Sequence, residues 1–265
     1  MKVAWRAFST VAVCGPAVIV GVVLAAREWP AEQWLTGAAD WLVDGGGLGP
    51  GSVWFWVLAV AGAVVVASPL WSILRYAETL VHEMGHAYVA GMLGALPARI
   101  TIEADHSGLA QWRGHRGRLR NALATFSGYP WPVVVGCGAV LCASVGAGRA
   151  WVVWAAVVAA VTVVGMARNA LAVCVSVAAA TLLGAVVWLQ ASAAPAIAVL
   201  VGLLLIDAGV RSAIGLLRLR DLTGSDPARL RQLVFVPARL AAVSMAALIA
   251  ALIAVCGWVL VAAGT

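Results

Sequence analysis

The stretch LVHEMGHAYVAG, residues 80–91, places two of the chain's four histidines four residues apart, with a glutamate directly after the first. On a helix such residues share a face, so the imidazoles of His82 and His86 can bind one metal ion. This spacing is typical of zinc sites in which the glutamate, here Glu83, acts on a water molecule as a general base without being a ligand. Glu78, one turn before His82, is a candidate partner of a ligand. The pattern predicts one Zn²⁺ ion and hydrolytic chemistry.

A catalytic zinc site needs a third protein ligand and keeps one position open for water. We favour Asp226, in LTGSDPARLRQL, although a serine and an aspartate before a proline are also typical of a helix start. Asp207, in LLLIDAGVRS, is the alternative, although an ion pair with Arg211 one turn later would also explain a carboxylate in an apolar span. Three further candidates complete the set: Asp105, His106 and Asp221.

The elements that must position these side chains are apolar helices. The chain has 265 residues, of which 63% are hydrophobic and 11% charged, a balance that no soluble globular domain needs. Apolar runs of about 18 residues or more are typical of transmembrane helices. We therefore expect an all-α integral membrane protein, a polytopic bundle of about seven spans. These spans are expected at residues 7–26, 53–70, 122–146, 150–167, 170–190, 195–217 and 238–262.

Two segments between the spans have other patterns. The histidine segment, 71–96, has both ends on the cytoplasmic side if the spans alternate, which predicts a re-entrant helix or a helix near that membrane face. Residues 98–112 alternate in polarity around a turn at Asp105-His106-Ser107-Gly108, which predicts a short β-hairpin. We divide the chain into three parts: a span and outer loop at 1–52, a membrane core at 53–240 that includes the third-ligand region 207–226, and a C-terminal span at 241–265.

The net charge of +6 fits membrane topology and does not indicate nucleic-acid binding. Arginines gather in two loops, 97–121 and 218–232, which the positive-inside rule places in the cytoplasm, whereas the acidic loop 27–52 is expected outside. The five cysteines are odd in number and lack a CxxC spacing, which argues against a disulfide framework or a cysteine metal site.

An HExxH motif in a polytopic membrane protein resembles the site-2 protease family of intramembrane zinc metalloproteases, and in particular a bacterial branch of small site-2-like peptidases. The matching stretches are TLVHEMGHAYVAGMLG, ARITIEADHSGLAQW, FSGYPWP, ARNALAV and GSDPARLRQLVFVPARL, between about residues 70 and 240. The resemblance assigns the aspartate of the last stretch, Asp226, as the third ligand. The chain departs from better-studied members because it lacks their Leu-Asp-Gly motif, and IDAG at 206–209 is the nearest string.

The resemblance implies hydrolysis of a peptide bond in a transmembrane protein substrate, near the cytoplasmic face of a bacterial inner membrane. Glu83 would move the proton, and Asn169 would be a candidate donor to the developing oxyanion. The hairpin would offer an edge strand, at Ile100, Thr101, Ile102 and Glu103, to which an extended substrate adds.

Two other functions are compatible with these residues. A zinc-binding membrane scaffold or regulator would need the histidines but not the general base. A transporter would use Asp207 and Arg211 as an intramembrane charge pair, but it predicts symmetric repeats, which the sequence lacks. The sequence does not indicate an oligomeric state.

Overall fold

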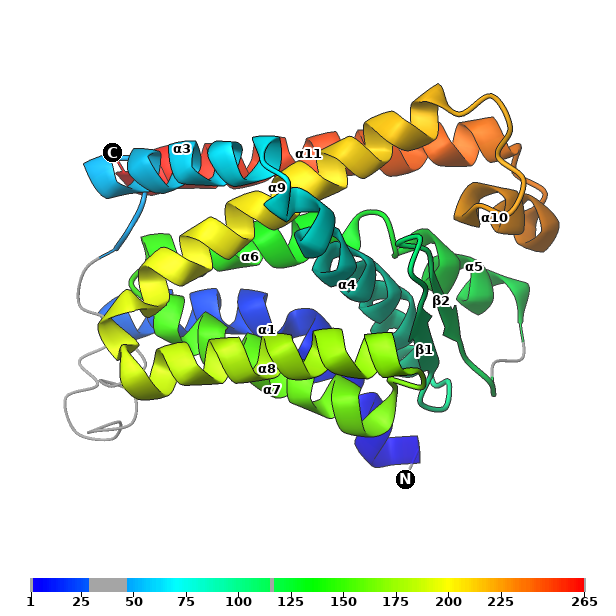
Figure 1. Cartoon of the computed structure of the whole chain (residues 1–265), viewed down its shortest axis with the longest axis horizontal. Helices are drawn as coiled ribbons and strands as arrows, with labels where there is room; N and C mark the ends of the chain where they lie inside the picture. Colours follow the sequence, from blue (N-terminus) through cyan, green and yellow to red (C-terminus); the bar gives the residue numbers. More distant parts are fainter. Residues whose placement is uncertain (1, 29–46, 115–116, 265) are drawn as a thin grey trace.

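The computed structural model describes residues 2–28, 47–114 and 117–264 (Figure 1). The expected outer loop lies mostly outside the described residues. The helices are α1 (Lys2–Glu28), α3 (Val53–Ala67), α4 (Leu70–Met92), α5 (Arg118–Phe126), α6 (Trp131–Ser144), α7 (Gly148–Gly165), α8 (Ala170–Leu189), α9 (Ala194–Arg218), α10 (Asp226–Val234) and α11 (Ala238–Gly264), with a short 3₁₀ turn, η1 (Ala191–Ala193), before α9. The strands are β1 (Arg99–Ile102) and β2 (Gly108–Gln111). The all-α class and the hairpin are confirmed.

Within the described residues, five helical segments are long and apolar enough to cross a membrane, and two bent helix pairs raise the number to seven. The chain is therefore a multi-pass membrane protein. The pair α3 and α4 bends by 101°, and the pair α5 and α6 bends by 57°. Prolines occupy both breaks, at Pro69 and Pro130, where they cannot donate a helical hydrogen bond.

These bends correct two expected boundaries. The span at 122–146 is not one straight helix, because Ser127–Pro130 separates α5 from α6. The span expected at 53–70 ends at Ala67, and the histidine helix α4 follows after a two-residue break. In Figure 1, α3 starts at the end of the bundle opposite the hairpin, and α4 finishes beside the hairpin. The histidine helix is thus the second helix of a bent pair, an arrangement that a broken span and the expected re-entrant segment have in common.

The hairpin, α5 and α10 gather at one end of the bundle, to the right in Figure 1. Helix α4 reaches this end from the interior and contacts α5, β1 and β2. Its close approach to the chain after α5 depends on Gly85, because a Cβ there would lie 2.5 Å from the Cβ of Trp131. On another face of α4, the buried hydroxyl of Tyr88 lies 2.8 Å from that of Thr162 on α7. These contacts fix α4 where its histidines face α5 and α10.

Both edges of β1 are paired. On one side it pairs antiparallel with β2, with Ile100 opposite Ala110. On the other side, the Ile100 N–H donates to the Met166 carbonyl at 2.8 Å, and the Ile100 carbonyl accepts from the Arg168 N–H at 2.9 Å. The Asn169 side chain continues this pairing, because its amide donates to the Ile102 carbonyl at 2.7 Å. Strand β1 is therefore held between β2 and the start of α8.

The outer edge of β2 is free of such partners in the described part of the chain. Residues alternate along an antiparallel pair between facing the partner strand and facing away. Because Ile100 and Ile102 direct their N–H and C=O groups toward residues 166–169, their opposite residues, Gly108 and Ala110, direct theirs away from β1. The hairpin thus presents one unpaired backbone edge.

Asn169 connects the hairpin to α8, so its loss should destabilise the protein. Its side-chain oxygen also caps α8 by accepting from the Ala172 N–H at 3.1 Å. We expect Asn169→Ala to cost about 2 kcal/mol and to lower the melting temperature in detergent by roughly 4–8 °C. Asn169→Asp keeps the cap but loses the amide donor, so its melting temperature should lie between those of the wild type and Asn169→Ala. A melting temperature unchanged in Asn169→Ala would contradict this role.

Candidate metal centre

The two histidines of α4 point at each other from successive turns. Their Nε2 atoms lie 3.2 Å apart, and the His86 side chain is 4% exposed. The other ring nitrogen of His86, Nδ1, lies 2.8 Å from the Ala124 carbonyl on α5 and must donate to it, because a carbonyl only accepts. This bond fixes the tautomer in which the lone pair of Nε2 is available to a metal ion.

Asp226 reaches the same point from the first residue of α10. Its Oδ2 lies 3.0 Å from the His86 Nε2 and 3.3 Å from the His82 Nε2. The chain turns toward α10 at Gly224, whose φ of 81° is a left-handed conformation that glycine adopts without strain. Burial raises the pKa of the Asp226 carboxyl. The positive charge of His86 and His82, together with their hydrogen bonds to the carboxylate, outweighs burial and holds this pKa well below its ordinary value. The carboxylate is therefore ionised and faces both rings.

The donor set and its spacing fit a zinc ion. Two ligand atoms bound to one tetrahedral zinc, each at about 2.0–2.2 Å, lie roughly 3.3–3.6 Å from each other. The three separations among the Nε2 atoms and the Asp226 Oδ2 are 3.0, 3.2 and 3.3 Å. Among the described residues, His82, His86 and Asp226 are the one group of three or more histidine, cysteine or acidic side chains that meets at a common point. Two imidazoles and a carboxylate are ordinary zinc ligands.

Glu83 lies beside this group, buried under the hairpin. The residue is 5% exposed, and a Cβ on Gly108 of β2 would lie 2.7 Å from the Glu83 Oε1. Together with His82 and Asp226, it lines a cavity of about 260 Å³. The general-base candidate, two metal-ligand candidates and the free edge of β2 thus border one cavity.

The segment after α5 encloses the histidines from the other side. From the sequence we quoted it, as FSGYPWP, only for the family resemblance and gave Gly128 and Tyr129 no role. A Cβ on Gly128 would lie 2.4 Å from the His86 Nε2 and 2.8 Å from the His82 Cε1, so no larger residue fits there. Tyr129 lines the cavity, and its ring packs edge-on against His82 with centroids 4.9 Å apart. The SGYP string could have suggested a turn, but not its position against the histidines.

The alternative ligand, Asp207, binds an arginine and not the histidines. Its carboxylate forms an ion pair with the guanidinium of Arg211 at 2.6 Å, and it is not part of the group around His86. Glu78 does line the cavity, where it accepts a hydrogen bond from Ser212 of α9. The structure thus brings Asp226, and not Asp207, to the histidines.

The three weaker candidates also lie outside the group. Asp105 and Asp221 are exposed, and each accepts hydrogen bonds from the residue two positions later, Ser107 and Thr223 respectively. His106 lines the cavity, but its Nε2 contacts the Ser72 carbonyl at 2.8 Å, and its ring stacks on another α4 residue. These bonds hold the hairpin turn against α4.

Two expected roles do not agree with the positions found. Asn169 was the candidate oxyanion donor, but it does not line the cavity, and its amide is bonded to Ile102. The residues Ile100, Thr101, Ile102 and Glu103 were the expected substrate edge, but β1 is paired on both sides. The free edge belongs to β2 because residues 166–169, far along the chain, cover β1.

Comparison with known families decides the relationship. A family model described as Peptidase M50B-like matches residues 55–256, which is most of the chain. The chain belongs to this family. The resemblance to site-2 proteases is therefore confirmed, and the M50B-like chain is of the membrane metalloprotease kind. Comparisons with curated proteins and with solved structures give no match.

Metal analysis of aspartate variants tests the ligand set of this M50B-like chain. We expect purified wild type to hold about one zinc per chain and Asp226→Ala to lose it, because two histidines alone bind zinc weakly. Asp207→Ala is the matched control and should keep its zinc, since its partner is Arg211. The measurement is elemental analysis after gel filtration in detergent. Zinc retained in Asp226→Ala, or lost only in Asp207→Ala, would contradict the assignment.

Proposed function

We propose that the chain is an intramembrane zinc metalloprotease that hydrolyses a peptide bond of a transmembrane protein substrate. The observation that carries this proposal is the meeting of two histidines, an aspartate and a buried glutamate beside a free strand edge. A purely structural zinc site would use four protein ligands and leave no position for water. Here two of the three ligand candidates, His82 and Asp226, border an open cavity instead.

His82, His86 and Asp226 would hold the ion. Zinc, when bound, polarises a carbonyl group and lowers the pKa of a water molecule to about 7. Glu83 accepts the proton of the attacking water and passes it to the leaving amine, as a general base and then a general acid. Its burial under Gly108 keeps this carboxylate aimed into the cavity and away from bulk water. The chain's own groups thus cover both proton transfers.

Tyr129 is our candidate for the donor to the developing oxyanion. Four neutral hydroxyls line the cavity, and three already donate: Thr79 to the His106 carbonyl, Ser212 to Glu78 and Ser225 to the Leu222 carbonyl. In the described part of the chain, the Tyr129 hydroxyl has no such partner, so its proton is available. A donor placed beside the scissile carbonyl stabilises the charge that forms there.

The outer edge of β2 is our candidate for the surface that receives the substrate. An extended peptide that pairs with Gly108 and Ala110 satisfies its own backbone groups where water is scarce. Gly108 lies against Glu83, so such a strand passes directly over the general base. This proposal keeps the strand-addition mode that we expected, but moves it from β1 to β2.

The site would face the cytoplasm of a bacterial inner membrane. The hairpin end of the bundle carries arginines on α5, at the end of α9, on α10 and next to these helices: Arg113, Arg118, Arg120, Arg218, Arg220, Arg229 and Arg231. Positive loops stay on the cytoplasmic side during insertion. The resemblance to the bacterial branch supports this placement.

Glu83→Gln separates a protease from a zinc-binding scaffold. We expect the variant to keep its zinc but to lose at least about 100-fold in cleavage, because it cannot take a proton. New protein termini near transmembrane segments should be found by mass spectrometry in cells with the wild type and not in cells with the variant. If cells with the variant contain the same new termini, Glu83 is not the general base. If the variant instead keeps the protein's role in the cell without cleavage, the zinc-binding scaffold is favoured.

Tyr129→Phe tests the oxyanion donor. The ring and its contact with His82 remain, so zinc content and melting temperature should match the wild type. The turnover number should fall by about 100-fold, with little change in KM, if the lost hydroxyl acts only in the transition state. A rise in KM with unchanged turnover would show instead that Tyr129 only binds the substrate.

A further inference from the structure

A second cavity lies next to the metal centre, along the free edge of β2. Its volume is about 410 Å³, and it is bounded by β2 and the residue after it, by α5 and by α10. The lining includes Ala110, Trp112, Asn121, Thr125, Arg229 and Gln232. Nothing in the chemistry described above uses this cavity.

The cavity and the metal centre share the β2 edge. Gly108 borders the first cavity, and Ala110, two residues later, borders the second. A strand advances by about 3.3 Å per residue and turns alternate side chains to the same face. A peptide paired with this edge and cleaved above Glu83 therefore places a side chain at the second cavity about two to four residues from the cleaved bond.

Trp112 lines the second cavity and approaches the metal centre. One side of its ring system approaches His86, with centroids 6.1 Å apart, and its indole N–H donates to Asn121 at 2.9 Å. The guanidinium of Arg229 lies 5.8 Å from the centre of the same ring. The tryptophan is thus held by its neighbours, and it fixes Arg229 at the cavity by a cation–π contact.

The charge of the second cavity is set by Arg229. It is the one ionisable side chain among the described residues that line the cavity, and the other polar groups there are amides and a hydroxyl. Arg229 is exposed, and in the described part of the chain no carboxylate forms an ion pair with it. An arginine beside amide donors is complementary to a carboxylate, which accepts several hydrogen bonds at once.

We propose that this cavity is a side-chain subsite for an aspartate or glutamate of the substrate, about two to four residues from the cleaved bond. The proposal rests on the proposed protease function and names one feature of its substrates. Arg229 acts here in specificity and does not touch the reacting atoms. Its position on α10, three residues after Asp226, places it next to the ligand without contact with the ion.

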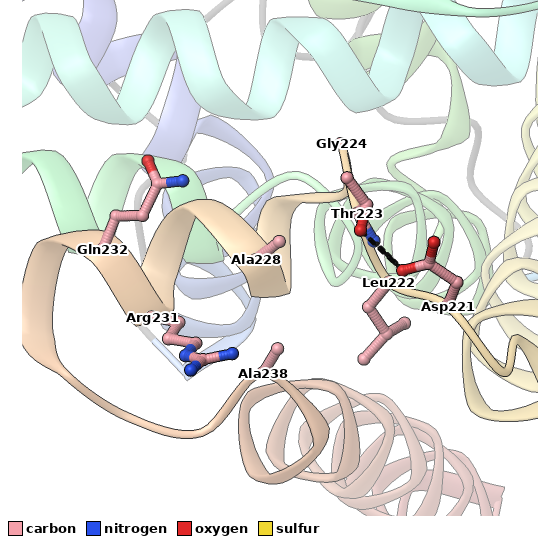
Figure 2. A pocket seen from close by; sticks show the side chains of 8 residues that line it. All are labelled: Asp221, Leu222, Thr223, Gly224, Ala228, Arg231, Gln232 and Ala238. Carbon is pink, nitrogen blue, oxygen red and sulfur yellow. Dashed lines mark hydrogen bonds between the residues drawn. The ribbon is translucent and has the colours of Figure 1, made fainter.

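Arg231, on the same helix, provides a matched control. It carries the same charge two residues later, but it lines a different cavity, with Asp221, Thr223 and Ala238 (Figure 2). Figure 2 shows its side chain directed toward Ala238 at the start of α11. Reversing its charge alters the net charge of α10 as much as reversing that of Arg229, but leaves the β2 edge untouched.

The test uses the full-length protein in detergent with zinc and a library of synthetic peptides whose positions around a small apolar centre are randomised. Cleavage products are mapped by mass spectrometry for the wild type, Arg229→Glu, Arg229→Gln and Arg231→Glu, with Glu83→Gln as background. We expect the wild type to favour acidic over basic residues by roughly tenfold at one position two to four residues from the cleaved bond. Arg229→Gln should lose this preference, Arg229→Glu should reverse it, and Arg231→Glu should retain it.

Zinc content and melting temperature show that each variant is folded. If the wild type has no acidic preference, or if Arg229→Gln keeps it, the subsite proposal is overturned while the protease function stands. If Arg231→Glu changes the preference as much as Arg229→Glu, the effect belongs to the general charge of α10, which also overturns the subsite. If no cleavage exceeds the Glu83→Gln background, the protease function itself fails, and the subsite with it.

Discussion

Three candidate metal ligands meet in a helical bundle whose described part has few other buried polar side chains. The Nε2 atoms of His82 and His86 and an oxygen of the Asp226 carboxylate lie 3.0–3.3 Å from one another. Their close approach is favourable when all three bind one cation. The arrangement places demands on its surroundings. Glycines at 85, 108 and 128 bring the neighbouring chain close to α4, and the Ala124 carbonyl orients one ring. Much of the local packing follows from this one meeting point.

The two bent helix pairs serve the same purpose. Irregular backbone at membrane depth is tolerated only where it is buried in protein or borders a cavity. The break at Ser127–Pro130 meets that condition, because its residues lie against the histidines and Trp131. The break before α4 allows the histidine helix to turn away from α3 and reach the hairpin. A bundle of straight spans would bring neither the Ala124 carbonyl to His86 nor Tyr129 to the wall of the cavity.

The histidine pair, the helical class and the hairpin could be predicted because each depends on local spacing. We favoured Asp226 from the sequence, but the residues alone could not settle the choice, because a helix start would also explain Asp226 and an ion pair would also explain Asp207. The free strand edge was placed on β1 because nothing in residues 166–169 indicates that they pair with Ile100. Hydropathy did not indicate the bend at Pro130, and we predicted one span at 122–146, because the break is only four residues long and lies within an apolar run. Tyr129 and Gly128 gain their importance only from where this bend puts them.

The long stretch of chain between the histidines and Asp226 has a consequence for biosynthesis. Asp226 lies 140 residues after His86, as 226 minus 86 shows, and the general-base candidate Glu83 lies between the two histidines. Proteins are made and inserted from the N-terminus. A nascent chain therefore exposes its imidazoles to the translocation machinery and to neighbouring proteins while it still lacks the carboxylate that completes the set. The order of translation would therefore delay metal binding until the chain through Asp226 has been made.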